Sequence, residues 1–274
     1  MAGVATGSGR EIRWEGADIG SARRQDEQRE MEKKLFDDVM HGKWEEVAYI
    51  YKNESAPTKI NPAGDTILHL AILMGNQDGV IKLMKLMEKQ VKGIMENILQ
   101  MKNDWGNTPL HQAAFVGMDN VCSFIAQHYH TQEVLQPRNK QGETPLHVAV
   151  LQGHKKAFLA LEPVIGTCRR GVDRKDGGNT ILHSAIFREH FDLALTVIQT
   201  YPNLLHYKNE EGDSALHILA RKPSAFESGT HLSLLDRFIY HSIHVKDTEH
   251  PTDKKISRQD VQDDHKASDG NFIF

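Results

Sequence analysis

The sequence has few of the features that mark secreted or membrane-spanning proteins. Its 274 residues include only two cysteines, Cys122 and Cys168, so a disulfide framework is excluded and a reducing compartment is expected. No stretch approaches the roughly 18 consecutive apolar residues that a membrane helix requires. The N-terminus also lacks the apolar core of a secretory signal. We therefore predict a cytoplasmic protein that does not insert into a membrane.

Excess charge and catalytic motifs are also missing. The chain has 33 lysines and arginines against 37 aspartates and glutamates, a formal net charge of −4. A charge so near neutrality gives no electrostatic reason to expect nucleic acid or anionic membrane as a partner. The sequence contains no G-x-x-x-x-G-K-S/T, no G-x-S-x-G and no H-E-x-x-H. It therefore lacks the motifs of phosphate-binding loops, of nucleophile-elbow hydrolases and of zinc proteases.

The sequence does contain a fourteen-residue string that occurs five times without a gap. The five copies are PAGDTILHLAILMG from Pro62, DWGNTPLHQAAFVG from Asp104, KQGETPLHVAVLQG from Lys140, DGGNTILHSAIFRE from Asp176 and EEGDSALHILARKP from Glu210. Their histidines are 42, 36, 36 and 34 residues apart. Repeats of this length, each too small to bury its own apolar face, stack into a solenoid.

The residue types in the string suit the beginning of a helix. A hydroxyl residue stands at the N-cap position in every copy: Thr66, Thr108, Thr144, Thr180 and Ser214. Pro109 and Pro145 follow at the first helical position, where no backbone N–H is needed. The histidine falls three residues after the cap, from where its side chain can reach back as in a capping box. These motif histidines are His69, His111, His147, His183 and His217.

A second helix is predicted after each string. Apolar residues recur there at two aligned positions three residues apart, which places them on one helical face. The two sets are Val80, Cys122, Phe158 and Ala194, and then Leu83, Ile125, Leu161 and Val197. Cys122 is therefore predicted to be a core residue and not a reactive thiol.

The repeats define the predicted domain organisation. A repeat domain is expected over residues 31–246, between a flexible leader (1–30) and a flexible tail (247–274). It consists of a cap over 31–61, with two short helices around Gly42, and of repeats that start near residues 62, 104, 140, 176 and 210. An amphipathic closing helix is predicted from Leu232. The longer first gap is assigned to an extended second helix.

The recurring string resembles the ankyrin repeat, whose signature is T-P-L-H-x-A at a period of about 33 residues. This resemblance implies an all-α solenoid of about five helix-turn-helix repeats with β-turn fingers, plus capping helices. It also implies a scaffold that binds other proteins and is not an enzyme.

The repeats together with the stretch LHILARKPSAFESGTHLSLLDRFIYHSI look like the plant ankyrin proteins that carry a C-terminal Pro-Gly-Gly membrane domain. Such resemblance implies a role in stress or defence signalling and an array that faces the cytosol. The sequence ends at Phe274 without the Pro-Gly-Gly segment, so we expect a short isoform, a truncated product or a fragment. Attachment at the cytosolic face of a membrane, through an anchored relative as partner, stays open as an alternative.

Sixteen histidines raise the question of a metal site. The motif histidines belong to different repeats, whose helices pack about 8–10 Å apart, whereas zinc–nitrogen bonds are about 2.0–2.1 Å long. His128 and His130 point to different faces of a helix, and His241 and His244 have no cysteine or carboxylate at a familiar spacing. We therefore expect neither a metal nor a cofactor.

The favoured function is a non-catalytic protein–protein interaction scaffold. Two alternatives remain: an enzyme subunit with an unrecognised site, and a truncated isoform without a partner of its own. In ankyrin proteins the variable contacts are made by turn tips and by the last exposed residues of the first helix of each repeat. The alignment places these positions at Trp105, Leu73, Met74, Phe115, Val116, Leu151, Phe187, Arg188 and Arg221. The alternative for the apolar ones is that the next repeat buries them as core.

Overall fold

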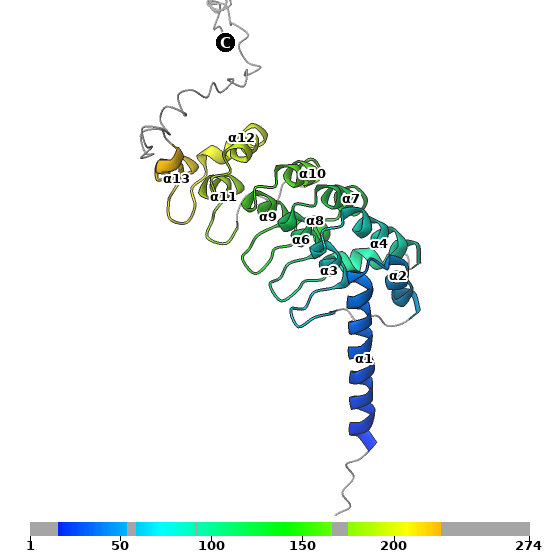
Figure 1. Cartoon of the computed structure of the whole chain (residues 1–274). Helices are drawn as coiled ribbons and strands as arrows, with labels where there is room; N and C mark the ends of the chain where they lie inside the picture. Colours follow the sequence, from blue (N-terminus) through cyan, green and yellow to red (C-terminus); the bar gives the residue numbers. More distant parts are fainter. Residues whose placement is uncertain (1–15, 54–58, 91–92, 166–174, 226–274) are drawn as a thin grey trace, which may run out of the picture. The chain divides into compact units, whose positions relative to one another are not determined.

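The structure, a computed structural model, describes residues 16–53, 59–90, 93–165 and 175–225 (Figure 1). The chain divides into two units, residues 1–226 and 227–274, and every described residue lies in the first. The predicted closing helix from Leu232 and the predicted tail over 247–274 lie outside the described residues.

Five inner helices begin directly after the threonine or serine of the recurring string. They are α3 (Ile67–Leu73), α6 (Pro109–Val116), α9 (Pro145–Leu151), α11 (Ile181–Phe187) and α13 (Ala215–Ala220). Each inner helix packs against the inner helix of the next repeat. The string therefore builds the continuous layer that joins one repeat to another.

Four outer helices cover this layer. They are α4 (Gln77–Gln90), α7 (Asp119–His128), α10 (Lys155–Ile165) and α12 (Phe191–Thr200). Each packs against the inner helix of its own repeat. Short helices follow several of these elements: α5 (Ile94–Gln100), α8 (Gln132–Leu135), η2 (Pro202–His206) and, after α13, η3 (Pro223–Ala225).

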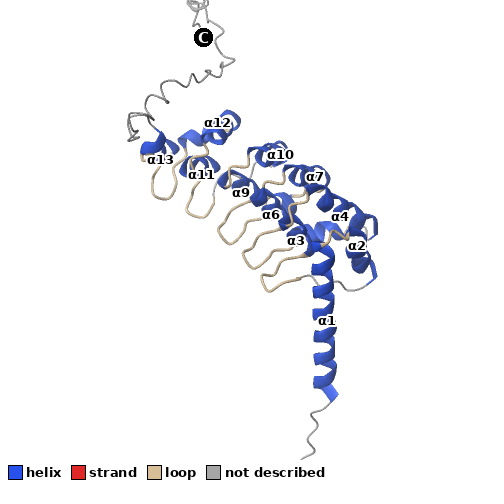
Figure 2. Cartoon of the chain, in the orientation of Figure 1, coloured by secondary structure: helices blue, strands red, loops and turns tan. Residues whose placement is uncertain are grey.

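The described residues contain no β-strand, and an isolated bridge joins Lys208 to Ser214. Helices account for the regular structure, and the loops that precede the inner helices stand beside one another (Figure 2). The predicted all-α repeat solenoid is therefore confirmed.

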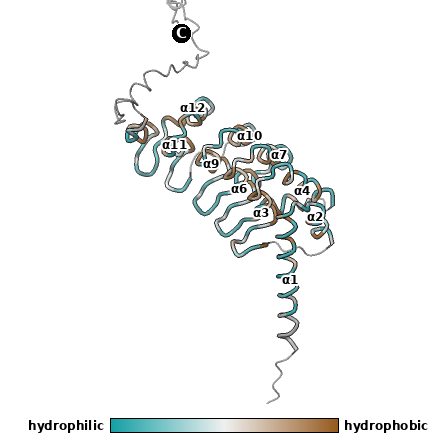
Figure 3. Tube along the Cα trace, viewed as in Figure 1, coloured by the Kyte–Doolittle hydropathy of each residue, from teal (hydrophilic) through white to brown (hydrophobic). Residues whose placement is uncertain are grey.

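The core lies between the inner and outer helices. These helices carry most of the hydrophobic residues, whereas the loops before the inner helices are largely hydrophilic (Figure 3). All eight apolar positions predicted for the second helices are buried. Cys122 is 0 % exposed, and burial raises the pKa of its thiol to about 12, which confirms it as a core residue. Cys168 lies outside the described residues.

The N-terminal cap is longer than the sequence suggested. α1 (Gly16–Met40) and α2 (Trp44–Asn53) flank Gly42, whose φ of 68° makes the turn that was expected there. However, α1 begins at Gly16, within the leader that was expected to be flexible up to residue 30. This part of α1 has no apolar repeat, but pairs such as Arg23–Glu27, four residues apart, support an exposed helix. α1 thus extends into residues 16–30, which the sequence analysis had assigned to the leader.

The sequence analysis assigned the longer first gap to one extended helix, but the structure has two helices there. α4 has 14 residues where α7 has 10, and α5 has 7 residues where α8 has 4. Gly93, at φ 79°, is the N-cap of α5 and separates the two helices. The insertion therefore lengthens both helical pieces.

Candidate protein-binding surface

The motif histidines hold the backbone at the start of the inner helices. In the first repeat the Thr66 N–H donates to His69 Nδ1 at 3.2 Å, and the Thr66 hydroxyl lies 2.8 Å from the same nitrogen. The same pair of contacts recurs at His111, His183 and His217. The capping role predicted from the sequence is confirmed at these positions.

The other ring nitrogen links neighbouring repeats, which the sequence analysis did not foresee. His69 Nε2 donates to the Asn107 carbonyl at 2.9 Å, and His111 Nε2 to the Glu143 carbonyl at 3.0 Å. His183 makes the equivalent bond to Asp213 at 3.0 Å. Since Nδ1 accepts and Nε2 donates, each of these rings is neutral with its proton on Nε2.

Burial keeps these rings uncharged. Desolvation lowers the pKa of His111 to about 4, although its bond to the Glu143 carbonyl opposes the shift. Desolvation also lowers the pKa of His147, to about 3, and that of His69. No cluster of three or more potential metal-ligating side chains occurs in the described part of the chain. His69, His111 and His183 instead act as hydrogen-bonding elements between repeats.

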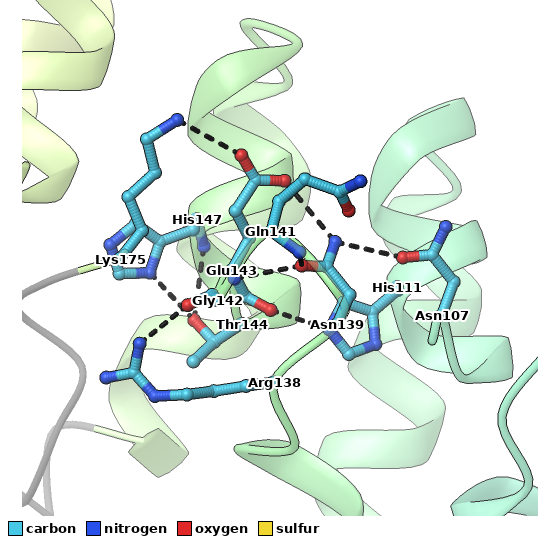
Figure 4. A network of polar contacts seen from close by, with 10 residues as sticks. All are labelled: Asn107, His111, Arg138, Asn139, Gln141, Gly142, Glu143, Thr144, His147 and Lys175. Atoms are coloured by element: carbon cyan, nitrogen blue, oxygen red, sulfur yellow. Dashed lines mark hydrogen bonds and ion pairs between the residues drawn. The ribbon is translucent and has the colours of Figure 1, made fainter. Parts of the chain in front are cut away.

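The loop before each inner helix is a tight turn, which we call a finger. The five fingers cover residues 61–65, 103–107, 139–143, 175–179 and 209–213. In the third finger Asn139 Oδ1 accepts from the N–H groups of Gln141 and Glu143, at 3.0 and 2.9 Å (Figure 4). Gly142 adopts φ 71°, and a Cβ there would overlap Asp176 of the next finger. The glycine is therefore needed for both the turn and the close approach.

Hydrogen bonds join each finger to the next. Backbone N–H groups of Asp104, Lys140 and Glu210 donate to carbonyls of the preceding fingers at 3.0–3.2 Å. In a second series, the first side chain of one finger donates to the last side chain of the preceding finger. The pairs are Asn103 to Asp65, Asn139 to Asn107, Lys175 to Glu143 and Asn209 to Asn179. The third of these is an ion pair in place of an amide contact (Figure 4). The fingers are thereby fixed relative to one another.

The predicted contact residues at the ends of the inner helices are largely exposed. We call them the apolar stripe: Leu73, Met74, Phe115, Val116, Leu151 and Phe187. Leu73 is 50 % exposed, Phe115 52 % and Phe187 61 %, whereas Leu151 is half-buried. Their neighbours at the start of the same helices, such as Leu110, are fully buried. The next repeat therefore leaves most of the stripe in contact with solvent.

Two histidines outside the motif fix the backbone beneath the stripe. His154 Nε2 lies 3.1 Å from the Phe115 carbonyl, and His190 Nε2 lies 3.2 Å from the Leu151 carbonyl. A Cβ at Gly117 or Gly153 would overlap the corresponding ring. Each histidine comes seven residues after a motif histidine, directly after the end of its fourteen-residue string, a signal that the sequence analysis did not use.

The fourth and fifth repeats place charged residues at the end of the stripe. Arg188 is exposed, as predicted, but Arg221 makes a bidentate ion pair with the mostly buried Asp213 of its own repeat. Lys222 pairs with Glu189 at 3.2 Å and lies 5.0 Å from the Phe187 ring centroid. Part of the positive charge at this end of the stripe is thus neutralised within the chain.

Trp105 stands at the tip of the second finger and is 54 % exposed. Its backbone is held on both sides, because its N–H donates to Asn103 Oδ1 at 3.0 Å and its carbonyl accepts from Lys140. The indole ring is therefore presented from a fixed turn.

No helix within the described ranges combines the length and the apolar character that crossing a bilayer demands.

Comparison with known proteins agrees with this geometry. Residues 85–163 match the family model for ankyrin repeats in three copies. The crystal structure of EF0377, an ankyrin repeat protein, superimposes with a TM-score of 0.54 at 16 % identity, covering 68 % of this chain and 90 % of that one. At this identity the likeness shows the fold alone. No curated protein matches the sequence.

Proposed function

We propose that this chain, which contains ankyrin repeats, is a non-catalytic scaffold that binds a protein partner through the apolar stripe and Trp105. The observation that carries the proposal is the exposure of large apolar side chains at one equivalent position of successive repeats. Contiguous exposed apolar surface marks interaction sites on soluble proteins. Aromatic residues and arginine are the types that contribute most binding energy at interfaces.

The polar groups support binding over catalysis. The buried motif histidines are neutral and hold backbone groups, so they are not poised to transfer a proton to a substrate. An enzyme subunit with an unrecognised site would need a convergent set of polar side chains in a pocket. A product without a partner of its own would give no stripe-dependent binding in the experiment described below.

The finer assignment rests on the ARKPSAF stretch from Ala220, which looks like the plant ankyrin proteins with a Pro-Gly-Gly domain. Within this proposal the chain acts in plant stress or defence signalling, in the cytoplasm, and a membrane-anchored relative is one candidate partner. Co-isolation of the full chain with such a relative from salt-washed plant membranes supports this assignment. Recovery of the chain only from fractions that contain no such relative contradicts it.

The test is affinity capture from a plant-cell extract with the full chain and its variants. Trp105→Ala, Phe115→Ala or Phe187→Ala should weaken capture of the same partner by about 30-fold, which corresponds to about 2 kcal/mol at a binding hot spot. Thermal stability should change little, because these side chains are exposed. Phe191→Ala, at an exposed phenylalanine of α12 outside the stripe, is the matched control. Loss of folding in the three variants, or equal loss of capture in the control, would contradict the proposal.

A further inference from the structure

A second surface, which shares no residue with the apolar stripe, lies on the outer helix α4. This helix packs against both α2 and α7 (Figure 1). Its exposed side forms a pocket of about 410 Å³, lined by Asp78, Ile81, Lys82, Lys85, Leu86 and Lys89. At about 100° of rotation per residue, these six positions fall within an arc of about 140° on the helix. We call them the basic face of α4.

The lysines occupy the middle of the basic face. Lys82, Lys85 and Lys89 lie within about 60° of one another around the helix, and all three are exposed. Ile81 and Leu86 lie on the two sides of the lysines and are half-buried. The pocket therefore offers a row of cations between two apolar edges.

The positive charge of the basic face is only partly balanced within the described chain. Three lysines against one aspartate give the pocket lining a formal charge of +2. Lys82 pairs with Glu45 of α2 at 2.6 Å. Lys85 Nζ lies 5.4 Å from the Phe124 ring centroid, which holds this lysine toward α7. Lys85 and Lys89 make no ion pair with any residue that the structure describes.

This arrangement differs from that of an ordinary solvated helix. Opposite charges three or four residues apart stabilise a helix, whereas like charges at this spacing destabilise it. Lys85 is three residues from Lys82 and four from Lys89, so the lysines of the basic face repel one another.

The repeat itself does not require these lysines. At the positions aligned with Lys82 and Lys85, the other outer helices carry uncharged residues: Phe124 and Gln127 in α7, Ala160 and Pro163 in α10, and Thr196 and Gln199 in α12. A general need for a solvated outer surface would place charge on the other outer helices as well. The concentration of like charge on α4 therefore indicates a surface that an anionic partner neutralises.

We propose that the basic face of α4 is a second docking site, independent of the apolar stripe, for an acidic peptide segment of a partner protein. The segment supplies at least two aspartate or glutamate carboxylates to Lys85 and Lys89, and an adjacent apolar side chain that contacts Ile81 or Leu86. Complementary charge selects such segments and speeds their association.

The same features favour a peptide over an anionic membrane or a nucleic acid. The pocket has room for a side chain, and the half-buried Ile81 and Leu86 do not project as the apolar anchors of a membrane-surface helix do. The chain as a whole carries a formal charge of −4, which opposes approach to an extended anionic surface.

The experiment is selection of displayed random peptides of about 12 residues on the full chain. Peptides that still bind a Lys85→Gln/Lys89→Gln variant are removed. Lys155→Gln/Lys156→Gln, which removes the same charge from exposed lysines of α10, is the matched control. The expected peptides are rich in aspartate and glutamate and contain a large apolar residue. Their affinity should fall about tenfold in the first variant and less than about twofold in the control.

Both variants should keep the circular-dichroism spectrum of the wild type, because the altered side chains are exposed. If the double variant fails to fold, Lys89→Gln alone should weaken the same peptides about threefold. An unchanged affinity in that single variant would overturn the proposal.

Other results would also overturn it. They are a selection that enriches no acidic peptide, an equal loss of affinity in the α10 control, and an affinity that does not change between about 50 mM and about 300 mM salt. Vesicles of phosphatidylserine or a single-stranded oligonucleotide that bind through Lys85 and Lys89 more tightly than the peptides would replace the acidic segment by a membrane or a nucleic acid. The Phe115→Ala/Phe187→Ala variant should bind the peptides as the wild type does, and a loss there would place them on the stripe instead.

Discussion

Acidification should destabilise the repeat stack through its buried histidines. His111 is buried, its Nδ1 accepts from the Thr108 N–H at 3.1 Å, and its Nε2 donates to Glu143 of the next repeat. A proton added to Nδ1 removes the acceptor of the first bond and places a charge in the core. The folded state therefore resists protonation, whereas the unfolded chain does not.

The magnitude follows from the difference in pKa between the two states. The pKa of His111 falls from 6.5 to about 4 on folding, and that of His147 falls to about 3. Because the unfolded state binds the proton first, stability is fully present above about pH 6.5 and is lost as the pH falls toward 4. Between about pH 7.5 and pH 5.5 each of these two histidines costs slightly more than about 1 kcal/mol, so the two together cost about 2–3 kcal/mol. His69, whose pKa is also lowered, acts in the same direction.

The assay is urea unfolding of the full chain at several values of pH. Glutamine can accept at its oxygen and donate from its nitrogen as the neutral histidine does, but it does not titrate. His111→Gln should therefore reduce the slope of the free energy of unfolding against pH by about 1 kcal/mol per pH unit between about pH 5 and pH 6. Ile125→Val, at a buried position nearby in the chain, should lower stability by about 1 kcal/mol at every pH without changing the slope.

Two results would refute this reasoning. A wild-type chain whose stability is constant over this range would show that the histidines do not resist protonation in the fold. A His111→Gln slope equal to that of the wild type would show that His111 is not among the groups responsible.

Three further predictions concern stability. Gly142→Ala should lower the free energy of unfolding in urea by about 1–3 kcal/mol, because Gly142 has a positive φ. The loss should exceed that of Gly75→Ala, because a Cβ at Gly75 would meet nothing within 4 Å. Equal losses would show that the close approach to Asp176 is unimportant. Lys175→Ala should destabilise by leaving the mostly buried Glu143 without its lysine, and Glu143→Asn with Lys175→Asn should recover most of the loss by recreating an amide contact. Hydrogen exchange should show earliest opening in the fifth repeat, because Leu216 is 62 % exposed while its counterparts Leu68, Leu110, Leu146 and Leu182 are buried; uniform protection would contradict this.

The local structure of the repeats was predictable because the motif contains short-range rules. A threonine three residues before a histidine specifies a helix start, and apolar residues three apart specify a buried face, so the start of α6 and the burial of Cys122 followed directly. The start of α1 did not follow, because the sequence of its first half has no apolar period, and the contact described there joins the exposed charged side chains of Arg23 and Glu27. The break at Gly93 was missed because the length of an insertion does not say where a helix is interrupted.

The contact residues were chosen from aligned positions, and alignment predicts which residues are equivalent but not what each one touches. Phe115 and Phe187 are exposed at equivalent places, as required for a shared surface. Arg221 is also equivalent to them, yet its guanidinium makes an ion pair with Asp213 of its own finger. In earlier repeats the residue at the Asp213 position accepts from the next finger, for example Asp65 from Asn103. The side chain that extends the stripe in the alignment is thus engaged within the fifth finger, so we expect the binding surface to end at Phe187 and Arg188.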